Sequence, residues 1–189
     1  MKGSLRLGGH DLLLVLFLVY LVLLVWVVVW KLDVPYVGAA ALLPRPIKLI
    51  PFVPTGEAGA SAPLEVLANI LLFVPFGLYL GLLAPTWRWW KPTAAFVVAS
   101  LVLEATQHLL STGSFDTTDI IVNTVGGLVG LGLLALAHRR LQARTAVVMT
   151  RALLIGTVVS LVAIGTFVAS PLHHDQLRDV IFASPAPSP

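Results

Sequence analysis

The chain has 189 residues, of which 58% are hydrophobic and only 11% are charged, and its mean hydropathy is +0.94. Because so few charges cannot cover a water-facing surface, the composition predicts an integral membrane protein. The chain contains no cysteine, which excludes disulfides, thiolate catalysis and cysteine metal sites. The net charge of +3 would suit nucleic acid, but the basic residues flank apolar runs. We therefore attribute them to membrane topology and expect no nucleic-acid partner.

Five apolar runs follow one another along the chain, each near the roughly 20 residues that a bilayer core of about 30 Å requires. The predicted transmembrane helices are residues 12–30, 64–84, 93–110, 120–137 and 152–169. The first run is longer than the apolar part of a signal peptide and ends in bulky residues, so we expect it to be retained. The predicted fold is an all-α, polytopic membrane helix bundle in the plasma membrane.

The segments outside these runs divide the rest of the chain. Residues 1–11 are predicted to be a cytoplasmic N-terminus, residues 12–170 the membrane domain, and the Pro-rich residues 171–189 a disordered tail. Six prolines in residues 34–63 predict a long loop between the first two helices. With the N-terminus in the cytoplasm, eight of the twelve lysines and arginines lie inside and four outside, which favours this orientation.

Under this orientation, the unusual polar residues of the second, third and fourth helices fall in one extracytoplasmic layer. They are Glu65, Asn69, Glu104, Gln107, Asp116, Asp119 and Asn123. A charge at the centre of a membrane helix costs about 2.5–3.5 kcal/mol on insertion scales, so we expect these side chains to face the bundle and form one polar site. Glu104 is the candidate for any catalytic role.

Structural roles for the same residues stay open at this stage. Asn69 and Asn123 suit interhelical hydrogen bonds. Asp119 suits an N-cap of the fourth helix, because aspartate before an apolar run is a start signal. Asp116 suits a solvated loop acid, and His108 an interfacial histidine.

Small residues and proline are expected to shape the helix packing. These residues are Pro75, Gly77, Gly126 and Gly130. Pro75 lacks a backbone N–H and is expected to kink the second helix. Gly126 and Gly130 form a small-xxx-small pair that allows another helix to approach closely, and Gly156 with Ser160 forms a second such pair.

Known catalytic and cofactor motifs do not match. His108 lacks the second histidine of H-E-x-x-H, and the chain has neither G-x-S-x-G nor a Gly-rich phosphate loop. We therefore expect no metal or cofactor, and the sequence offers no positive evidence for an enzyme. Five helices without an internal repeat are also a poor basis for a transporter acting alone.

The central motifs resemble those of the VanZ-like family of small bacterial membrane proteins. They cover about residues 48–135 and comprise Leu49-Ile50-Pro51-Phe52, the run from Asn69 to Gly77, Glu104-x-x-Gln107, Asp116-x-x-Asp119 and Asn123-x-x-Gly126-x-x-x-Gly130. Two positions depart from the family pattern: Ser114 stands where the family usually has arginine, and Lys48 where it tends to asparagine. Without the arginine, the site is more negative, which favours cation binding or proton sharing.

The resemblance implies a cell-envelope role related to resistance to the lipoglycopeptide teicoplanin, by a mechanism that is not established, and it assigns no catalytic residues. We expect a non-enzymatic membrane protein, partnered by the lipid bilayer, whose polar site binds a lipid or lipid-linked cell-wall ligand. Two alternatives are an intramembrane enzyme acting on such a lipid, with Glu104 as acid or base, and an accessory subunit of a transporter or flippase.

Overall fold

The computed structural model describes residues 8–31, 47–53 and 63–169. These residues form the helices α1 (Gly9–Trp30), α2 (Pro63–Leu83), α3 (Trp90–Leu109), α4 (Thr117–Leu141) and α5 (Thr145–Val168). A short 3-10 turn, η1 (Gln142–Arg144), joins α4 to α5. The predicted all-α class is confirmed, and the predicted tail at residues 171–189 lies outside the described residues.

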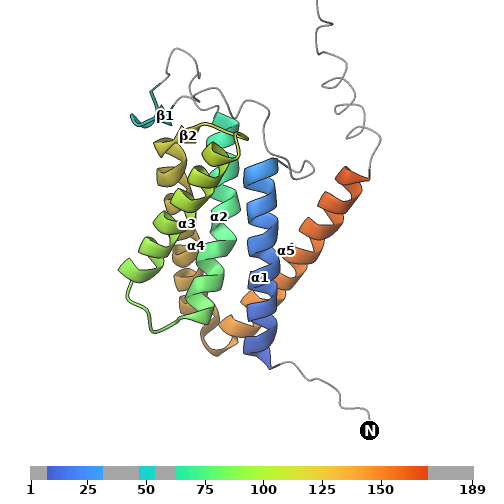
Figure 1. Ribbon diagram of the computed structural model, residues 1–189. Coiled ribbons are helices and arrows are strands. Elements are labelled where there is room, and N and C mark those ends of the chain that lie inside the picture. Colours follow the sequence, from blue (N-terminus) through green and yellow to red (C-terminus); the bar gives the residue numbers. More distant parts are fainter. Residues whose placement is uncertain (1–7, 32–46, 54–62, 170–189) are drawn as a thin grey trace, which may run out of the picture.

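The sequence did not predict the small strand pair at one end of the bundle. Strands β1 (Ile47–Lys48) and β2 (Phe115–Asp116) run parallel, with Ile47 opposite Phe115 and Lys48 opposite Asp116. Strand β1 belongs to the predicted 34–63 loop, and β2 belongs to the loop between α3 and α4. Their pairing therefore holds these two loops together (Figure 1). Most of that predicted loop lies outside the described residues.

The helix ends follow local chemistry. Pro63 opens α2 at the first helical position, where its missing N–H costs nothing. Asp116 is the N-cap of α4, since its carboxylate accepts a hydrogen bond of 2.8 Å from the Thr118 N–H. The interpretation of Asp119 as the cap is therefore wrong, because the helix begins before Asp119 and places that side chain in its first turn.

Helices α2 and α4 approach each other closely through glycine. A Cβ atom at Gly126 would collide with the Ile70 carbonyl oxygen, and one at Gly130 with the Val74 carbonyl oxygen. On the facing helix, a Cβ atom at Gly77 would collide with the backbone of α4. The second small-xxx-small pair behaves differently: among the described residues, a Cβ at Gly156 would meet nothing within 4 Å, so it marks no close helix contact.

Aromatic residues fill the space between α1, α2 and α3. Phe73 and Phe96 are fully buried, and Phe76 packs edge-on against Phe96 with ring centroids 5.3 Å apart. Tyr20 of α1 lies in the same cluster and donates a hydrogen bond of 2.7 Å to the Leu72 carbonyl oxygen. Helix α2 runs without a break through Pro75. Phe73 lies about one helical turn from Asn69 along α2, so the aromatic core adjoins the predicted polar site.

Three segments of the described residues are long and apolar enough to cross a membrane: Gly9–Trp30, Pro63–Leu83 and Thr117–Val168. The last of these contains α4, η1 and α5, and α3 is not among the three. Many large apolar side chains on these helices are exposed, including Val22 at 68% and Val159 at 60%. Such a surface suits lipid better than water.

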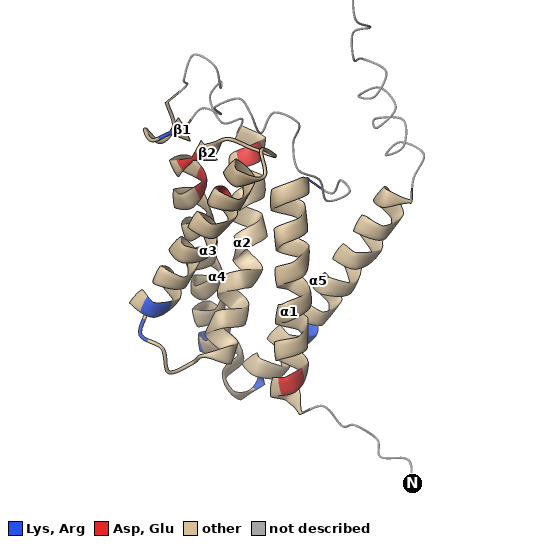
Figure 2. Ribbon diagram, in the orientation of Figure 1, with Lys and Arg blue, Asp and Glu red and all other residues tan. Residues whose placement is uncertain are grey.

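The charged residues divide between the two ends of the bundle. Figure 2 shows most acidic residues at the end where β1 and β2 lie, while the basic residues of α3 and α4 lie at the opposite end. Arg139 and Arg140 fall in the last turn of α4, whereas Asp119 falls in its first turn. Between these two residues and Asp119, α4 carries no further aspartate, glutamate, lysine or arginine.

Candidate functional site

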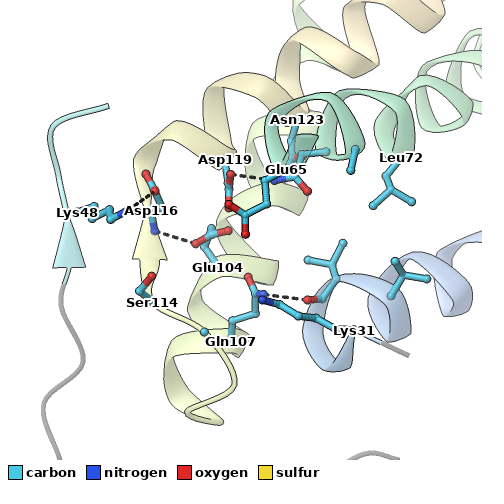
Figure 3. Close-up of a pocket in the computed structure, with 15 residues that line it drawn as sticks. Lys31, Lys48, Glu65, Leu72, Glu104, Gln107, Ser114, Asp116, Asp119 and Asn123 are labelled. Atoms are coloured by element: carbon cyan, nitrogen blue, oxygen red, sulfur yellow. Dashed lines mark hydrogen bonds and ion pairs between the residues drawn. The ribbon is translucent and has the colours of Figure 1, made fainter. Parts of the chain in front are cut away.

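A cavity of about 510 Å³ opens at the acidic end of the bundle. All seven residues of the predicted polar site line it, together with Lys31, Lys48 and Ser114 (Figure 3). These residues come from α1, α2, α3, α4 and the β1–β2 region. The structure therefore brings together polar side chains that are up to 92 positions apart, from Lys31 to Asn123.

Glu104 lies at the centre of the site. It is 1% exposed, and its carboxylate accepts a hydrogen bond of 2.9 Å from the backbone N–H of Asp116. Its carboxyl group also lies beside that of Asp119, which projects from the first turn of α4. Two neighbouring carboxyl groups in a buried place repel each other when both are charged, so the site favours a proton or a cation between them.

Two asparagines join the helices around this acid pair. Asn69 of α2 donates a hydrogen bond of 2.8 Å to the Asp119 carboxylate of α4. Asn123 of α4 donates one of 2.8 Å to the Ser100 hydroxyl of α3. Both side chains thus make the interhelical hydrogen bonds that were one of the alternatives from sequence. Asn123 is only 3% exposed, and its Oδ1 accepts no hydrogen bond from the described residues.

Gln107 connects the site to α1. Its Nε2 donates a hydrogen bond of 2.8 Å to the Val28 carbonyl oxygen in the last turn of α1, and its own backbone oxygen accepts from Thr112 and Gly113. His108 does not line the cavity, and its buried Nδ1 has no partner among the described residues. Gln107 therefore fixes the turn after α3, whereas His108 stands apart from the site.

Asp116 and Lys48 form a buried ion pair at the cavity wall. Their charged atoms are 3.4 Å apart, and each residue is 6% exposed. Burial alone would raise the pKa of Asp116, but the hydrogen bonds from Thr118 and the charge of Lys48 outweigh it and hold that pKa below its usual value. The interpretation of Asp116 as a solvated loop acid is therefore wrong.

The segment around Lys48 is fixed to the start of α4 by hydroxyl groups. Thr117 Oγ1 donates to the backbone oxygens of Lys48 and Leu49, at 3.1 Å each, and Thr118 Oγ1 accepts from the Phe52 N–H at 3.0 Å. The Leu49-Ile50-Pro51-Phe52 motif thus positions one wall of the cavity. Sequence reasoning missed this role of Lys48, although its departure from the family pattern was a signal.

Lys31 is a second basic residue that sequence reasoning did not place in the site. It caps the C-terminus of α1 in the left-handed region, with φ at 51°, and its exposed side chain extends toward Gln107 and the acids (Figure 3). The cavity therefore holds four carboxyl groups against two amino groups. The described part of the chain contains no group of three or more histidine, aspartate or glutamate residues arranged to hold a metal ion.

Comparison with known proteins agrees with these motifs. The family model described as VanZ/LLP1 matches residues 17–138, which extend from α1 through most of α4. The chain is also 34% identical over 127 residues to Protein VanZ of Enterococcus faecium, a match that covers 67% of this chain and 76% of that protein. No solved structure shows a significant match. The chain therefore belongs to the VanZ/LLP1 family.

Proposed function

We propose that this chain is a multi-pass plasma-membrane protein with a cell-envelope role related to teicoplanin resistance, and that its polar cavity binds the headgroup of a lipid or a lipid-linked cell-wall component. Binding of that component by the protein would alter the access of a lipoglycopeptide to the cell surface. In this role the protein is not an enzyme and uses no cofactor.

The observation that carries this proposal is the cavity itself. Its volume of about 510 Å³ lies in the range of small-molecule sites, roughly 300–1,000 Å³. Its lining includes the buried residues Glu104 and Asn123, and the Oδ1 of Asn123 has no partner among the described residues. A buried polar atom without a partner costs roughly 1–3 kcal/mol, so a ligand that supplies the missing donor is favoured.

In the proposed topology all five helices cross the membrane, the N-terminus is cytoplasmic and the cavity opens outside. The basic residues at the opposite end of the bundle support this orientation, because cytoplasmic ends are enriched in lysine and arginine. The chain has no cysteine, so single cysteines can report sidedness without background. In intact cells, Ser114→Cys should react with a membrane-impermeant maleimide, whereas Arg140→Cys should react only after lysis. The reverse pattern would overturn the orientation.

Antibiotic sensitivity tests the function. Expression of the wild-type protein in a sensitive host should raise the teicoplanin concentration that stops growth, and Glu104→Gln should remove most of that increase at equal protein level. Gly156→Ala, which changes a position with open space around it, is the matched control and should behave as wild type. Unchanged sensitivity and envelope composition with the wild-type protein would overturn the proposal.

One observation favours an alternative, an intramembrane enzyme acting on an envelope lipid. Glu104 and Asp119 place two carboxyl groups side by side within a cavity, an arrangement that suits one acid and one base. Under this alternative, the purified protein turns over envelope lipids and Glu104→Gln abolishes the turnover while the protein remains folded. Equal turnover in that variant would remove Glu104 from any mechanism.

A further inference from the structure

The side of the polar cavity formed by Glu65, Glu104, Asp119 and Asn123 offers more hydrogen-bond acceptors than donors. Three of the cavity's amide and backbone donors are already used within the protein: Asn69 donates to Asp119, Gln107 to Val28, and the Asp116 N–H to Glu104. A carboxylate oxygen accepts several hydrogen bonds and donates none, so oxygens of the acids remain able to accept more. The buried Asn123 Oδ1 adds an acceptor that has no donor among the described residues. A ligand group suited to this side of the cavity must therefore bring donors.

The charge of the cavity points in the same direction. Glu65, Glu104 and Asp119 line it together, and Lys48 is engaged by Asp116 on one wall. Among the described residues, this leaves the amino group of Lys31 against three carboxyl groups. A ligand cation would reduce the repulsion between the acids, and hydrogen bonds from an ionised donor to a carboxylate are about twice as strong as neutral ones. The described residues show no grouping that suits a metal ion. An ammonium group, with three N–H donors, fits this set better.

A second cavity, of about 200 Å³, adjoins the first and is lined mainly by apolar side chains, with Tyr20, Thr157 and Ser160 also among its lining residues. It lies between α1, α2 and α5, and Val27 and Leu72 line both cavities. Its other walls include Leu23, Leu71 and Ile164. Figure 1 shows α5 at the edge of the bundle, tilted relative to α1 and separating from it toward the end where β1 and β2 lie. The shared residues place the apolar cavity, or fissure, directly beside the polar one, so that a polar end and an apolar end adjoin.

We propose that these two adjoining cavities together bind one amphiphile, a phospholipid whose headgroup carries a primary ammonium beside its phosphate. The ammonium lies among Glu65, Glu104, Asp119 and the Asn123 Oδ1, and Lys31 faces the phosphate. One acyl chain occupies the fissure between α1, α2 and α5. This assignment rests on the proposed headgroup cavity and adds the charge of the ligand, its polar group and the path of its chain.

Lipid binding to the full chain, purified in detergent, tests the assignment by native mass spectrometry. The probes are phosphatidylethanolamine and phosphatidylglycerol, which share acyl chains and differ in the ammonium, and free O-phosphoethanolamine, which has the headgroup alone. The wild-type protein should bind phosphatidylethanolamine at least about tenfold more tightly than phosphatidylglycerol, the ratio expected for one charge-assisted hydrogen bond. Free O-phosphoethanolamine should bind more weakly than the lipid.

Two variants separate the binding of the lipid headgroup from the binding of its acyl chain. Glu65→Gln changes an exposed wall residue, so the fold should survive, and it should remove most of the preference for phosphatidylethanolamine. Ser160→Phe fills the fissure and should weaken both lipids while leaving O-phosphoethanolamine binding unchanged. Val162→Phe is the matched control on α5, because Val162 is 60% exposed and lines neither cavity; it should bind as wild type.

Each contrary result would overturn a specific part of the lipid assignment. Equal binding of the two lipids, or an unaltered preference in Glu65→Gln, would overturn the ammonium assignment. Binding of O-phosphoethanolamine as tight as that of the lipid, with no effect of Ser160→Phe, would identify a soluble amine and overturn the acyl path. Lipid preference as expected but no change in teicoplanin sensitivity would instead count against the proposed function alone.

Discussion

The backbone N–H of Asp116 donates a hydrogen bond of 2.9 Å to the carboxylate of Glu104, which is 1% exposed. This bond ties the loop between α3 and α4 to the most deeply buried acid of the cavity. Glu104 therefore has a structural role beside any role in binding. Variants that keep or remove the acceptor oxygen separate these two roles.

Glu104→Gln should unfold only slightly more easily than the wild-type protein, because the amide oxygen can still accept from the Asp116 N–H. Glu104→Leu should lower the free energy of unfolding by about 1–3 kcal/mol more, since it leaves that buried N–H without a partner. Denaturant unfolding in detergent micelles, followed by tryptophan fluorescence, measures both. Equal losses in the two variants would show that the carboxylate charge, rather than the hydrogen bond, supports the loop.

The Lys48–Asp116 ion pair should show strong coupling in a double-mutant cycle. Lys48→Met leaves a buried carboxylate without its cation, and breaking a buried pair in this way costs about 3–5 kcal/mol. Asp116→Asn keeps an oxygen to cap α4, and in the double variant no unpaired charge remains. The double variant should therefore be more stable than Lys48→Met. Additive losses would contradict an energetic link between the two side chains.

The stability of the fold should depend on pH through the ionisation of Asp116. The folded protein holds the pKa of this carboxyl below its usual value of 3.8, so the group stabilises the fold at pH values above the usual pKa. That contribution is lost as the pH falls through the lower, folded pKa. The melting temperature should decline below about pH 4 in the wild-type protein, and Asp116→Asn should decline less steeply. Parallel pH profiles in micelles would contradict this assignment.

Hydropathy predicted the helices well because a run of apolar residues near bilayer length carries its own signal. The predicted 12–30 and 64–84 helices differ from α1 and α2 by at most three residues at either end, whereas α5 begins seven residues before the start of the predicted 152–169 helix. The start of α4 was harder to predict, since Asp116 and Asp119 both precede the apolar run. Only the hydrogen bond to Thr118 identifies Asp116 as the cap.

The candidate site was predicted where polar residues interrupt apolar runs, which is a local signal. The Lys48–Asp116 pair was missed because it joins residues 68 positions apart through two strands of two residues each. No periodicity accompanies such short strands. Contacts of this kind depend on the tertiary arrangement, which the local pattern of either segment does not contain.

Glycine patterns also do not reveal, by themselves, which helices they bring into contact. Gly126–Gly130 and Gly156–Ser160 have the same spacing, but only the first pair meets a facing backbone, so Gly130→Ala should destabilise the protein while Gly156→Ala should not. The added methyl at Gly130 meets the backbone of α2 near Val74, which cannot move as a side chain end could. Overpacking of this kind costs about 1–3 kcal/mol. Thermal unfolding of both variants in the same detergent measures the difference, and equal melting temperatures would show that α2 and α4 can separate without loss.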